Sequence, residues 1–216
     1  MKLKGAIFDF DGTLLDSMKI WLNLGEKYIT SKGLTPISGL YEELKPLSLV
    51  EAAQYFQKEY GIQSNEETII SEINTLIENE YRNTLLLKQS AEAFLEKLKR
   101  AKVKMCIATA MERPLVEAAL SRLKIADYFC GIITCGETGL GKDSPEIFRQ
   151  ALDLLHTSKD DTVVFEDALH AIETAKSAGF LVAAVYDESA KRDQAKIKAA
   201  ADWHLNSFDE WEMKES

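Results

Sequence analysis

The chain contains little of several residue types that would assign it to a specialised class. Its 216 residues include only three cysteines and four prolines. No apolar run is long enough to cross a bilayer, and the first residues lead directly into a strand-like segment instead of a signal peptide. The cysteines, Cys106, Cys130 and Cys135, lack the spacing of a zinc site or of a CxxC redox motif. These features disfavour a disulfide scaffold and a membrane anchor, and we expect a cytoplasmic protein with reduced thiols.

Positive charge is also scarce. The chain has 26 Lys and Arg residues against 35 Asp and Glu residues, which gives a net charge of −9, and no segment forms a basic stripe. We therefore expect neither nucleic acid nor an anionic membrane as a partner. An anionic substrate would have to be attracted locally, by a metal ion and a few cationic side chains. The content of 46% hydrophobic and 28% charged residues is that of an ordinary soluble globular protein.

Short apolar runs alternate with helical patterns over most of the chain. The expected strands are 3–10, 103–109, 131–134, 162–165, 181–186 and 201–205, and the expected helices are 90–101, 114–123, 145–156 and 168–178. Several of the strands are continuous apolar runs, which is typical of parallel strands covered on both faces. The alternation predicts an α/β domain with a doubly wound, Rossmann-like parallel sheet.

Residues 16–87 interrupt this alternation. They carry helical apolar stripes separated by glycine and proline, and they directly follow the first expected strand. We interpret them as an inserted all-α helical cap domain, and residues 1–15 and 88–216 as the α/β core domain. The alternative is that these helices pack onto the sheet as part of a single domain.

The first expected strand ends in two carboxylates. Asp9 and Asp11 are one residue apart, and Gly12 then breaks the strand pattern. Bringing two acids together at the rim of a core is unfavourable unless a cation or a reaction uses them. The ends of strands in an open α/β sheet are also where ligands bind. The motif therefore favours chemistry at this position, and phosphoryl chemistry is the sharpest hypothesis.

Three further polar positions lie at strand ends or helix starts. Thr109 ends one apolar run, Lys142 precedes an expected helix, and Glu166 and Asp167 follow another apolar run. Each alone has an ordinary interpretation: a helix cap, a solvated lysine, or acids that complement a helix dipole. Together they place a hydroxyl, a cation and further acids at successive strand ends, which is more than coincidence explains.

With these motifs, the chain resembles haloacid dehalogenase-type phosphohydrolases that carry a helical cap after the first strand. The resemblance covers essentially the whole chain and lies near the phosphoglycolate phosphatase and β-phosphoglucomutase branch. It rests on the Asp-Phe-Asp-Gly-Thr stretch at 9–13, on Thr109, on Lys142, and on the acidic pair at 166–167. The resemblance implies that Asp9 is the nucleophile, forming an aspartyl-phosphate, and that Asp11 is the general acid and base.

The resemblance also implies the remaining site. Thr109 and Lys142 would hold the phosphate oxygens as the charge redistributes. A Mg²⁺ cofactor would be held by the Asp9 carboxylate, the Asp11 backbone carbonyl and Asp167, with Glu166 as a further ligand or as a neighbour of the ligands. The residues expected to contact the substrate are Gly12, Thr13, Ala110, Arg113, Trp21 and Lys45. The implied partner is a small phosphorylated metabolite, acted on by a monomer or weak homodimer.

Three other functions have weaker support. Sugar-phosphate mutases of this type carry a histidine where this chain has Trp21 and an arginine where it has Leu49, so hydrolysis is favoured over isomerisation. A receiver-type signalling domain would be shorter and would lack both the cap and Asp11. Residues 136–142 have the glycine and lysine spacing of a P-loop, but Asp143 stands where that loop needs Ser or Thr.

Overall fold

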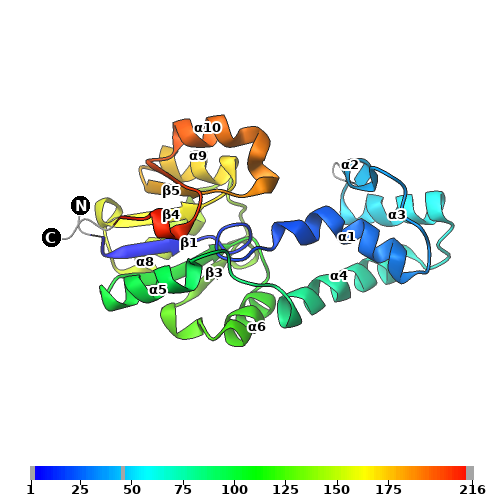
Figure 1. Ribbon diagram of the computed structural model, residues 1–216, viewed down its shortest axis with the longest axis horizontal. Coiled ribbons are helices and arrows are strands. Elements are labelled where there is room, and N and C mark those ends of the chain that lie inside the picture. Colours follow the sequence, from blue (N-terminus) through cyan, green and yellow to red (C-terminus); the bar gives the residue numbers. More distant parts are fainter. Residues whose placement is uncertain (1–2, 45–46, 213–216) are drawn as a thin grey trace. The chain divides into compact units, whose positions relative to one another are not determined.

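The computed structural model describes residues 3–44 and 47–212, and these form two compact units. One unit, called the core unit below, comprises Met1–Ser17 and Leu85–Ser216. The other, called the cap unit, comprises Met18–Thr84. The helices and strands of both units are labelled in Figure 1. No helix among the described residues is long and apolar enough to span a membrane.

The core unit is built on a sheet in which every pair of neighbouring strands is parallel. Within the described residues the sheet has six strands in the order β3-β2-β1-β4-β5-β6. They are β1 (Gly5–Phe8), β2 (Lys104–Thr109), β3 (Ile132–Thr134), β4 (Thr162–Glu166), β5 (Leu181–Val185) and β6 (Trp203–Leu205). This is the doubly wound, Rossmann-like α/β fold that the sequence predicts. The strand that carries the acidic motif, β1, lies at the centre between β2 and β4.

Helices connect these strands. The α-helices of the core unit are α5 (Ala91–Arg100), α6 (Arg113–Leu123), α7 (Cys135–Thr138), α8 (Glu146–Leu155), α9 (Leu169–Ser177) and α10 (Gln194–Ala200). Short 3₁₀ helices are η1 (Ala126–Tyr128), η2 (Lys159–Asp161), η3 (Glu188–Asp193) and η4 (Phe208–Glu210). Helices α5, α6, α8 and α9 correspond to the four expected helices, whereas α7 and α10 are additional. Gly179, just after α9, adopts a φ of 83°, which is easiest for glycine.

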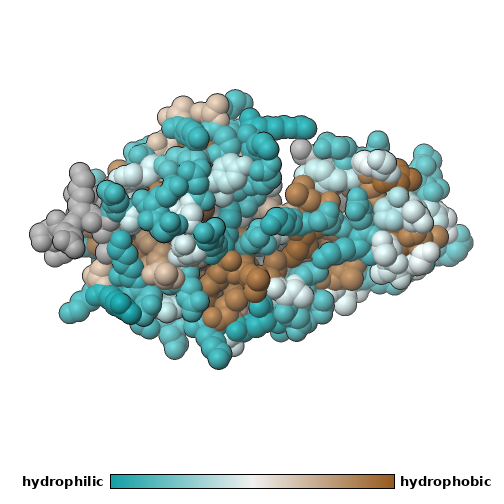
Figure 2. All heavy atoms as spheres, viewed as in Figure 1, coloured by the Kyte–Doolittle hydropathy of each residue, from teal (hydrophilic) through white to brown (hydrophobic). Residues whose placement is uncertain are grey.

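The sheet is buried on both faces because side chains alternate along each strand. Ile7 of β1 belongs to a hydrophobic cluster with residues of α8 and α9, such as Ala151 and Ile172. The next residue, Phe8, stacks on Phe165 of β4, with ring centroids 4.6 Å apart. Phe94 of α5 and Phe208 of η4 extend this aromatic layer. This two-sided burial explains why the strands are continuous apolar runs. In Figure 2, hydrophilic side chains cover most of the visible surface of the core unit, in keeping with the net charge of −9.

The cap unit is helical wherever it forms regular structure in the described residues. Its helices are α1 (Met18–Ser31), α2 (Leu40–Leu44), α3 (Leu49–Tyr60) and α4 (Glu66–Asn83). Ser48 and Glu51 form a reciprocal capping box at the start of α3, and Asn65 caps α4. Tyr28 of α1 packs against Phe56 of α3, with ring centroids 5.1 Å apart. Buried side chains of α1, α3 and α4 thus form the interior of this unit.

The chain re-enters the core unit next to the place where it leaves. The Asp16 amide donates to the Leu86 carbonyl at 3.0 Å, and the Lys88 amide donates to the Leu14 carbonyl at 2.8 Å. Leu15 and Leu87 form an antiparallel bridge. We expected the cap to span residues 16–87, whereas the compact unit is Met18–Thr84. Residues 85–87 group with the core because these backbone hydrogen bonds hold them there.

Candidate active site

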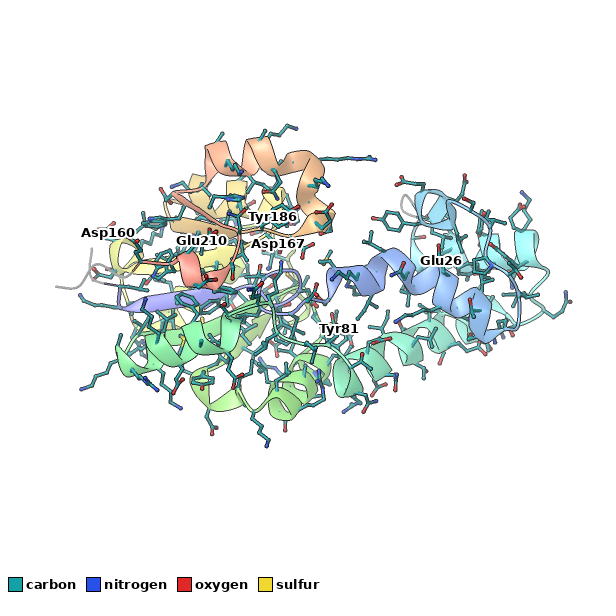
Figure 3. The ribbon with its side chains drawn as sticks, viewed as in Figure 1. Glu26, Tyr81, Asp160, Asp167, Tyr186 and Glu210 are labelled. Atoms are coloured by element: carbon teal, nitrogen blue, oxygen red, sulfur yellow. The ribbon has the colours of Figure 1, made fainter. Side chains whose placement is uncertain are left out.

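The polar residues singled out in the sequence meet at one edge of the sheet. Asp9 directly follows β1, Thr109 ends β2, Glu166 ends β4, and Asp167 follows Glu166. Because the strands are parallel, these residues share the carboxyl edge, where ligands bind in open α/β sheets. Figure 3 labels Asp167 at this edge and Asp160, which precedes β4, at the other.

Lys142 reaches this edge from the loop between α7 and α8. Its ammonium contacts Asp9 Oδ1 and lies 2.7 Å from Glu166 Oε1. The Lys142 side chain is 6% exposed, and both acids are buried as well. Burial by itself would lower the pKa of Lys142, but the charges of Asp9 and Glu166 outweigh it and raise that pKa above its ordinary value. The lysine is therefore a fixed positive charge that orients the Asp9 carboxylate.

The acids outnumber this one cation. The pKa of Asp9 is raised to about 7, mainly because the carboxyl is buried. The charge of Lys142 acts against this rise, and the charges of Glu166 and Asp11 add to it. Burial, then the charges of Glu166 and Asp9, raises the pKa of Asp167 well above its ordinary value. These raised pKa values arise because the carboxylates are shielded from water and, when ionised, repel one another. A bound cation would relieve this repulsion.

The arrangement of oxygen atoms fits a hard divalent cation. Asp9, Glu166 and Asp167 each offer a carboxylate oxygen, and these oxygens lie within 4.8 Å of one another. Buried carboxylate oxygens suit Mg²⁺, which takes oxygen ligands and usually keeps several waters. Glu166 is already engaged, since its Oε1 accepts from Lys142 and its Oε2 accepts from the Asp167 and Ala168 amides at 2.6 and 2.8 Å. Glu166 therefore acts as a support for Asp167 and Lys142, and Asp9 and Asp167 are the better metal ligands.

The loop after β1 is shaped around Asp167. Gly12 has a φ of 82°, and a side-chain carbon built on it would clash with the Asp167 carboxylate, whose Cγ would lie 2.8 Å away. The hydroxyl of Thr13 donates to Asp167 Oδ1 at 3.0 Å. The positive φ of Gly12 and the close approach of Asp167 both require glycine at position 12. The structure thus gives Gly12 and Thr13 a role in placing Asp167, while their contact with a substrate stays a prediction.

Thr109 is the last residue of the adjacent strand β2, and Ala110 follows it. The pairing of β1 with β2 brings Thr109 to the same edge as Asp9. Thr109 is buried, and its hydroxyl oxygen accepts from the Met111 amide at 3.0 Å, which fixes the side-chain rotamer. Ala110 is exposed. This geometry suits a hydroxyl and loop amides that receive an anion.

Arg113, expected to contact the substrate, is held by other protein groups. Its guanidinium donates to both carboxylate oxygens of Glu137, at 2.5 and 2.8 Å, and to the Ile132 carbonyl at 2.7 Å. The paired guanidinium lowers the pKa of Glu137 to about 2. Arg113 therefore joins the start of α6 to β3 and α7, and its contact with a substrate stays a prediction. Lys45, the other cation expected at the substrate, lies outside the described residues.

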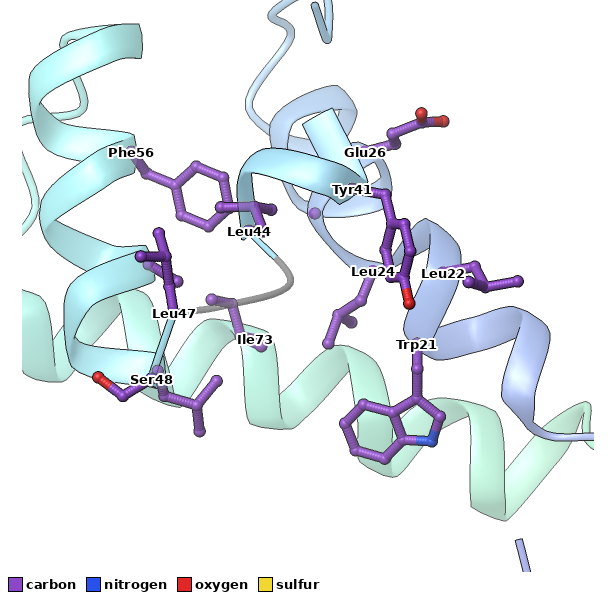
Figure 4. A pocket seen from close by; sticks show the side chains of 13 residues that line it. Trp21, Leu22, Leu24, Glu26, Tyr41, Leu44, Leu47, Ser48, Phe56 and Ile73 are labelled. Carbon is purple, nitrogen blue, oxygen red and sulfur yellow. The ribbon is translucent and has the colours of Figure 1, made fainter. Parts of the chain in front are cut away.

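Trp21 borders a cavity inside the cap unit (Figure 4). The cavity has a volume of about 260 Å³ and is lined mainly by apolar side chains. Its lining includes Leu49 of α3 as well as Trp21 of α1. These are the two positions where the mutase pattern has histidine and arginine. Both departures from that pattern thus fall on one apolar cavity.

One further ion pair near the site, between Lys88 and Asp187, was not predicted from the sequence. The Lys88 ammonium donates to the carbonyl oxygens of Gly12 and Tyr186, each at 2.6 Å. It also forms an ion pair with Asp187 at 2.8 Å, and both side chains are largely buried. Asp187 follows β5, so its place at the carboxyl edge could have been inferred from the strand pattern. Lys88 belongs to no motif, and only the folded chain brings it here.

A parallel α/β sheet with buried acids and a lysine at its carboxyl edge is the arrangement of an α/β enzyme with its active site at that edge. The family model for haloacid dehalogenase-like hydrolases matches residues 6–185 of this chain. The chain belongs to that family and is a hydrolase. The resemblance inferred from the motifs is confirmed.

Individual relatives agree with this assignment. The chain is 24% identical over 177 residues to a phosphorylated carbohydrates phosphatase of Thermotoga maritima, covering 82% of each protein. It is 26% identical over 200 residues to the mitochondrial (DL)-glycerol-3-phosphatase 1 of Arabidopsis thaliana, covering 89% of this chain and 67% of that protein.

Solved structures share the fold. A family IA, variant 3 hydrolase from Entamoeba histolytica has a TM-score of 0.77 and 21% identity, with coverage of 99% of this chain and 97% of that one. A β-phosphoglucomutase from Clostridium difficile has a TM-score of 0.68 and 20% identity, with coverage of 98% and 94%. Both neighbours show the same architecture over nearly the whole chain.

Proposed function

We propose that this hydrolase is a Mg²⁺-dependent phosphatase that cleaves a small phosphorylated metabolite through an aspartyl-phosphate on Asp9. The observation that carries the proposal is the position of Asp9: it is buried at the carboxyl edge of the sheet, held by Lys142, with Asp167 beside it. A carboxylate fixed in this way is suited to attack phosphorus. The named activities of the phosphatase relatives support the same chemistry.

The residues divide the reaction into two steps. A carboxylate oxygen of Asp9 attacks phosphorus, the bond from phosphorus to the ester oxygen breaks, and Asp11 gives its proton to that oxygen. Asp11 then takes a proton from water, whose oxygen attacks the same phosphorus. This second step releases inorganic phosphate and restores the Asp9 carboxylate.

The surrounding groups stabilise charge during both steps. Lys142 holds Asp9 and neutralises part of the charge that develops on the phosphoryl oxygens, together with the Thr109 hydroxyl and nearby amides. Asp9, Asp167 and the Asp11 carbonyl would hold Mg²⁺, which when bound reduces the repulsion between the anionic nucleophile and the anionic ester. Glu166 supports this set by fixing Lys142 and the Asp167 amide.

Release of inorganic phosphate from a panel of phosphate esters with Mg²⁺ tests the proposal. We expect the wild type to hydrolyse at least one ester and Asp9→Asn to hydrolyse none. Asp160→Asn, which changes an exposed acid at the other edge of the sheet, should keep the wild-type rate. Equal activity of wild type and Asp9→Asn, or no activity of the wild type on any ester, would contradict the proposal.

The same assay distinguishes a mutase. Adding a hexose bisphosphate and following phosphate transfer between positions would reveal isomerisation in place of release. The apolar Trp21 and Leu49 in the cap favour release. The cytoplasmic location and the monomeric or weakly dimeric state expected from the sequence remain predictions.

A further inference from the structure

Lys88 makes three short contacts in the interior of the core unit. Its ammonium donates to the carbonyl oxygens of Gly12 and Tyr186, each at 2.6 Å. The third contact is to Asp187 Oδ2 at 2.8 Å. An ammonium group has three N–H donors, so these acceptors satisfy it completely. The Lys88 side chain is 15% exposed and that of Asp187 is 7% exposed, which makes this a built contact and not a surface ion pair.

The carbonyl held by Lys88 belongs to the loop that carries the proposed acid. Gly12 follows Asp11 directly, and its amide donates to the Leu15 carbonyl at 3.0 Å. Both the N–H and the C=O of Gly12 are therefore fixed, one within the loop and the other by Lys88. With φ at 82°, this residue turns the chain sharply. Gly12 is bonded directly to Asp11, so this turn lies next to the backbone that carries the Asp11 side chain.

Asp187 keeps the lysine in place. Its Oδ1 accepts from the amide and the hydroxyl of Ser189, at 2.9 and 2.6 Å, while its Oδ2 binds Lys88. A carboxylate with this many donors has little freedom to move. The ammonium is therefore anchored at the end of β5 and reaches from there to the loop after β1. None of these contacts involves the side chains of Lys142 or Thr109, which hold the phosphoryl oxygens in the proposed reaction.

We propose that Lys88 is a positioning residue for proton transfer: by fixing the Gly12 carbonyl, it sets the orientation of Asp11. This inference rests on the proposed phosphatase reaction and adds to it a residue outside the four family motifs. Lys88 acts through Asp11, so its loss should impair protonation of the leaving oxygen. It should leave attack by Asp9 and binding of the phosphoryl group largely intact, because those depend on Lys142, Thr109 and the metal.

Esters with different leaving groups separate these effects. An alkyl phosphate needs a proton on its leaving oxygen, whereas p-nitrophenyl phosphate expels the p-nitrophenolate anion, which is stable without that proton. In Lys88→Met, kcat/KM for the alkyl ester hydrolysed fastest by the wild type should fall about tenfold or more, as expected when a general acid is misplaced. For p-nitrophenyl phosphate we expect a fall of less than about threefold, because little of that barrier is proton transfer.

The ratio of the two kcat/KM values is the decisive quantity. Both are measured on one preparation, so a reduced folded fraction cancels from the ratio. The matched control is Lys176→Met, which removes another lysine paired with an aspartate in the core unit, Asp202, away from the loop. This control should keep the wild-type ratio. If Lys88→Met does not fold, Lys88→Gln is measured in its place, because glutamine retains an N–H donor for the Gly12 carbonyl. The ratio for Lys88→Gln should fall below that of the wild type, but by less than the decrease predicted for Lys88→Met.

Equal falls for both esters in a folded Lys88 variant would overturn the inference and assign Lys88 to stability alone. That result would leave the proposed function standing, provided that the wild type releases phosphate and Asp9→Asn does not. If the wild type releases no phosphate from any ester, the proposed function is rejected, and the inference is rejected with it.

Discussion

Lys142 and Asp9 form an ion pair in which each side chain is less than a tenth exposed. The ammonium also binds Glu166, so one cation serves two buried carboxylates. The proposed nucleophile is therefore held by a residue that comes from a loop 133 positions further along the chain. Removing one member of a buried ion pair leaves the other charges uncompensated, and this sets the first prediction.

We expect Lys142→Met to abolish phosphate release and to destabilise the metal-free protein. Breaking a buried pair lowers the free energy of unfolding by about 3–5 kcal/mol, because the acids left behind are desolvated and unpaired. Lys4→Met breaks an exposed pair with Asp161, and such a change has an effect of about 1 kcal/mol or less. Urea unfolding of the two variants measures this difference. Similar small decreases in the free energy of unfolding of both variants would show that the Lys142 ion pair contributes no more to stability than an exposed pair.

Asp167→Asn should separate metal binding from folding. The substitution removes a proposed metal ligand and one of the mutually repelling carboxylates. Mg²⁺ raises the melting temperature of a protein that binds it only when folded. We expect this rise for the wild type and for Asp160→Asn, and a much smaller rise for Asp167→Asn at the same Mg²⁺ concentrations. An equal rise in all three proteins would place the metal elsewhere.

Two glycines with nearly equal φ values provide a matched test of the loop after β1. Gly12→Ala places a methyl group against the Asp167 carboxylate, whereas the space around Gly179 is open to 4 Å. Both substitutions strain a left-handed backbone, at about 1 kcal/mol or more each. Only Gly12→Ala should also abolish phosphate release. Activity assays and urea unfolding of both variants check this, and an active Gly12→Ala protein would contradict the geometry of the loop.

Stability should depend on Asp187 in a pH-dependent way. Burial would raise the pKa of Asp187, but hydrogen bonds from Lys88 and Ser189 outweigh it and lower the pKa below its ordinary 3.8. The folded state thus binds fewer protons than the unfolded state at low pH. The stabilisation is complete above about pH 4–5 and is lost as the pH falls through the lowered pKa. Nearby charges, including Asp167, change the size of the effect but not its sign.

Asp187→Asn makes this dependence measurable. The variant should be less stable than the wild type by about 1–3 kcal/mol at pH 7 and at pH 5, because Lys88 loses its charged partner. The difference should shrink at pH 3, below the ordinary pKa of 3.8, because the carboxyl of the unfolded wild type then takes up a proton and unfolding is favoured. Urea unfolding at the three pH values provides the comparison. A difference that is constant or grows toward pH 3 would show that the ion pair does not contribute in this way.

The parallel sheet and the acidic edge could be predicted because each is encoded locally. Continuous apolar runs mark strands that are covered on both faces, and a strand that ends in Asp9 or in Glu166 places that acid at the carboxyl edge. Helix α7 was not predicted, since it has only four residues and depends on the capping box between Thr134 and Glu137. Such short elements carry no periodic signal.

Contacts between distant segments could not be read from the sequence. Arg113 and Thr13 were both expected to contact the substrate, and the sequence did not indicate that Arg113 pairs with Glu137. Nor did it indicate that the Thr13 hydroxyl donates to Asp167. Lys88 lies 76 residues from Gly12, so nothing local indicates their contact. Motifs identify which residue types take part, and the tertiary structure decides which of them meet.

The most direct test of the central claim is mass spectrometry of the Asp9 peptide after acid quenching during turnover with Mg²⁺ and a hydrolysed ester. We predict one phosphoryl group on the peptide that contains Asp9, absent in Asp9→Asn and present in Asp160→Asn. Phosphate release at the wild-type rate with no phosphorylated form of that peptide, or with the phosphoryl group on another residue, would contradict the account.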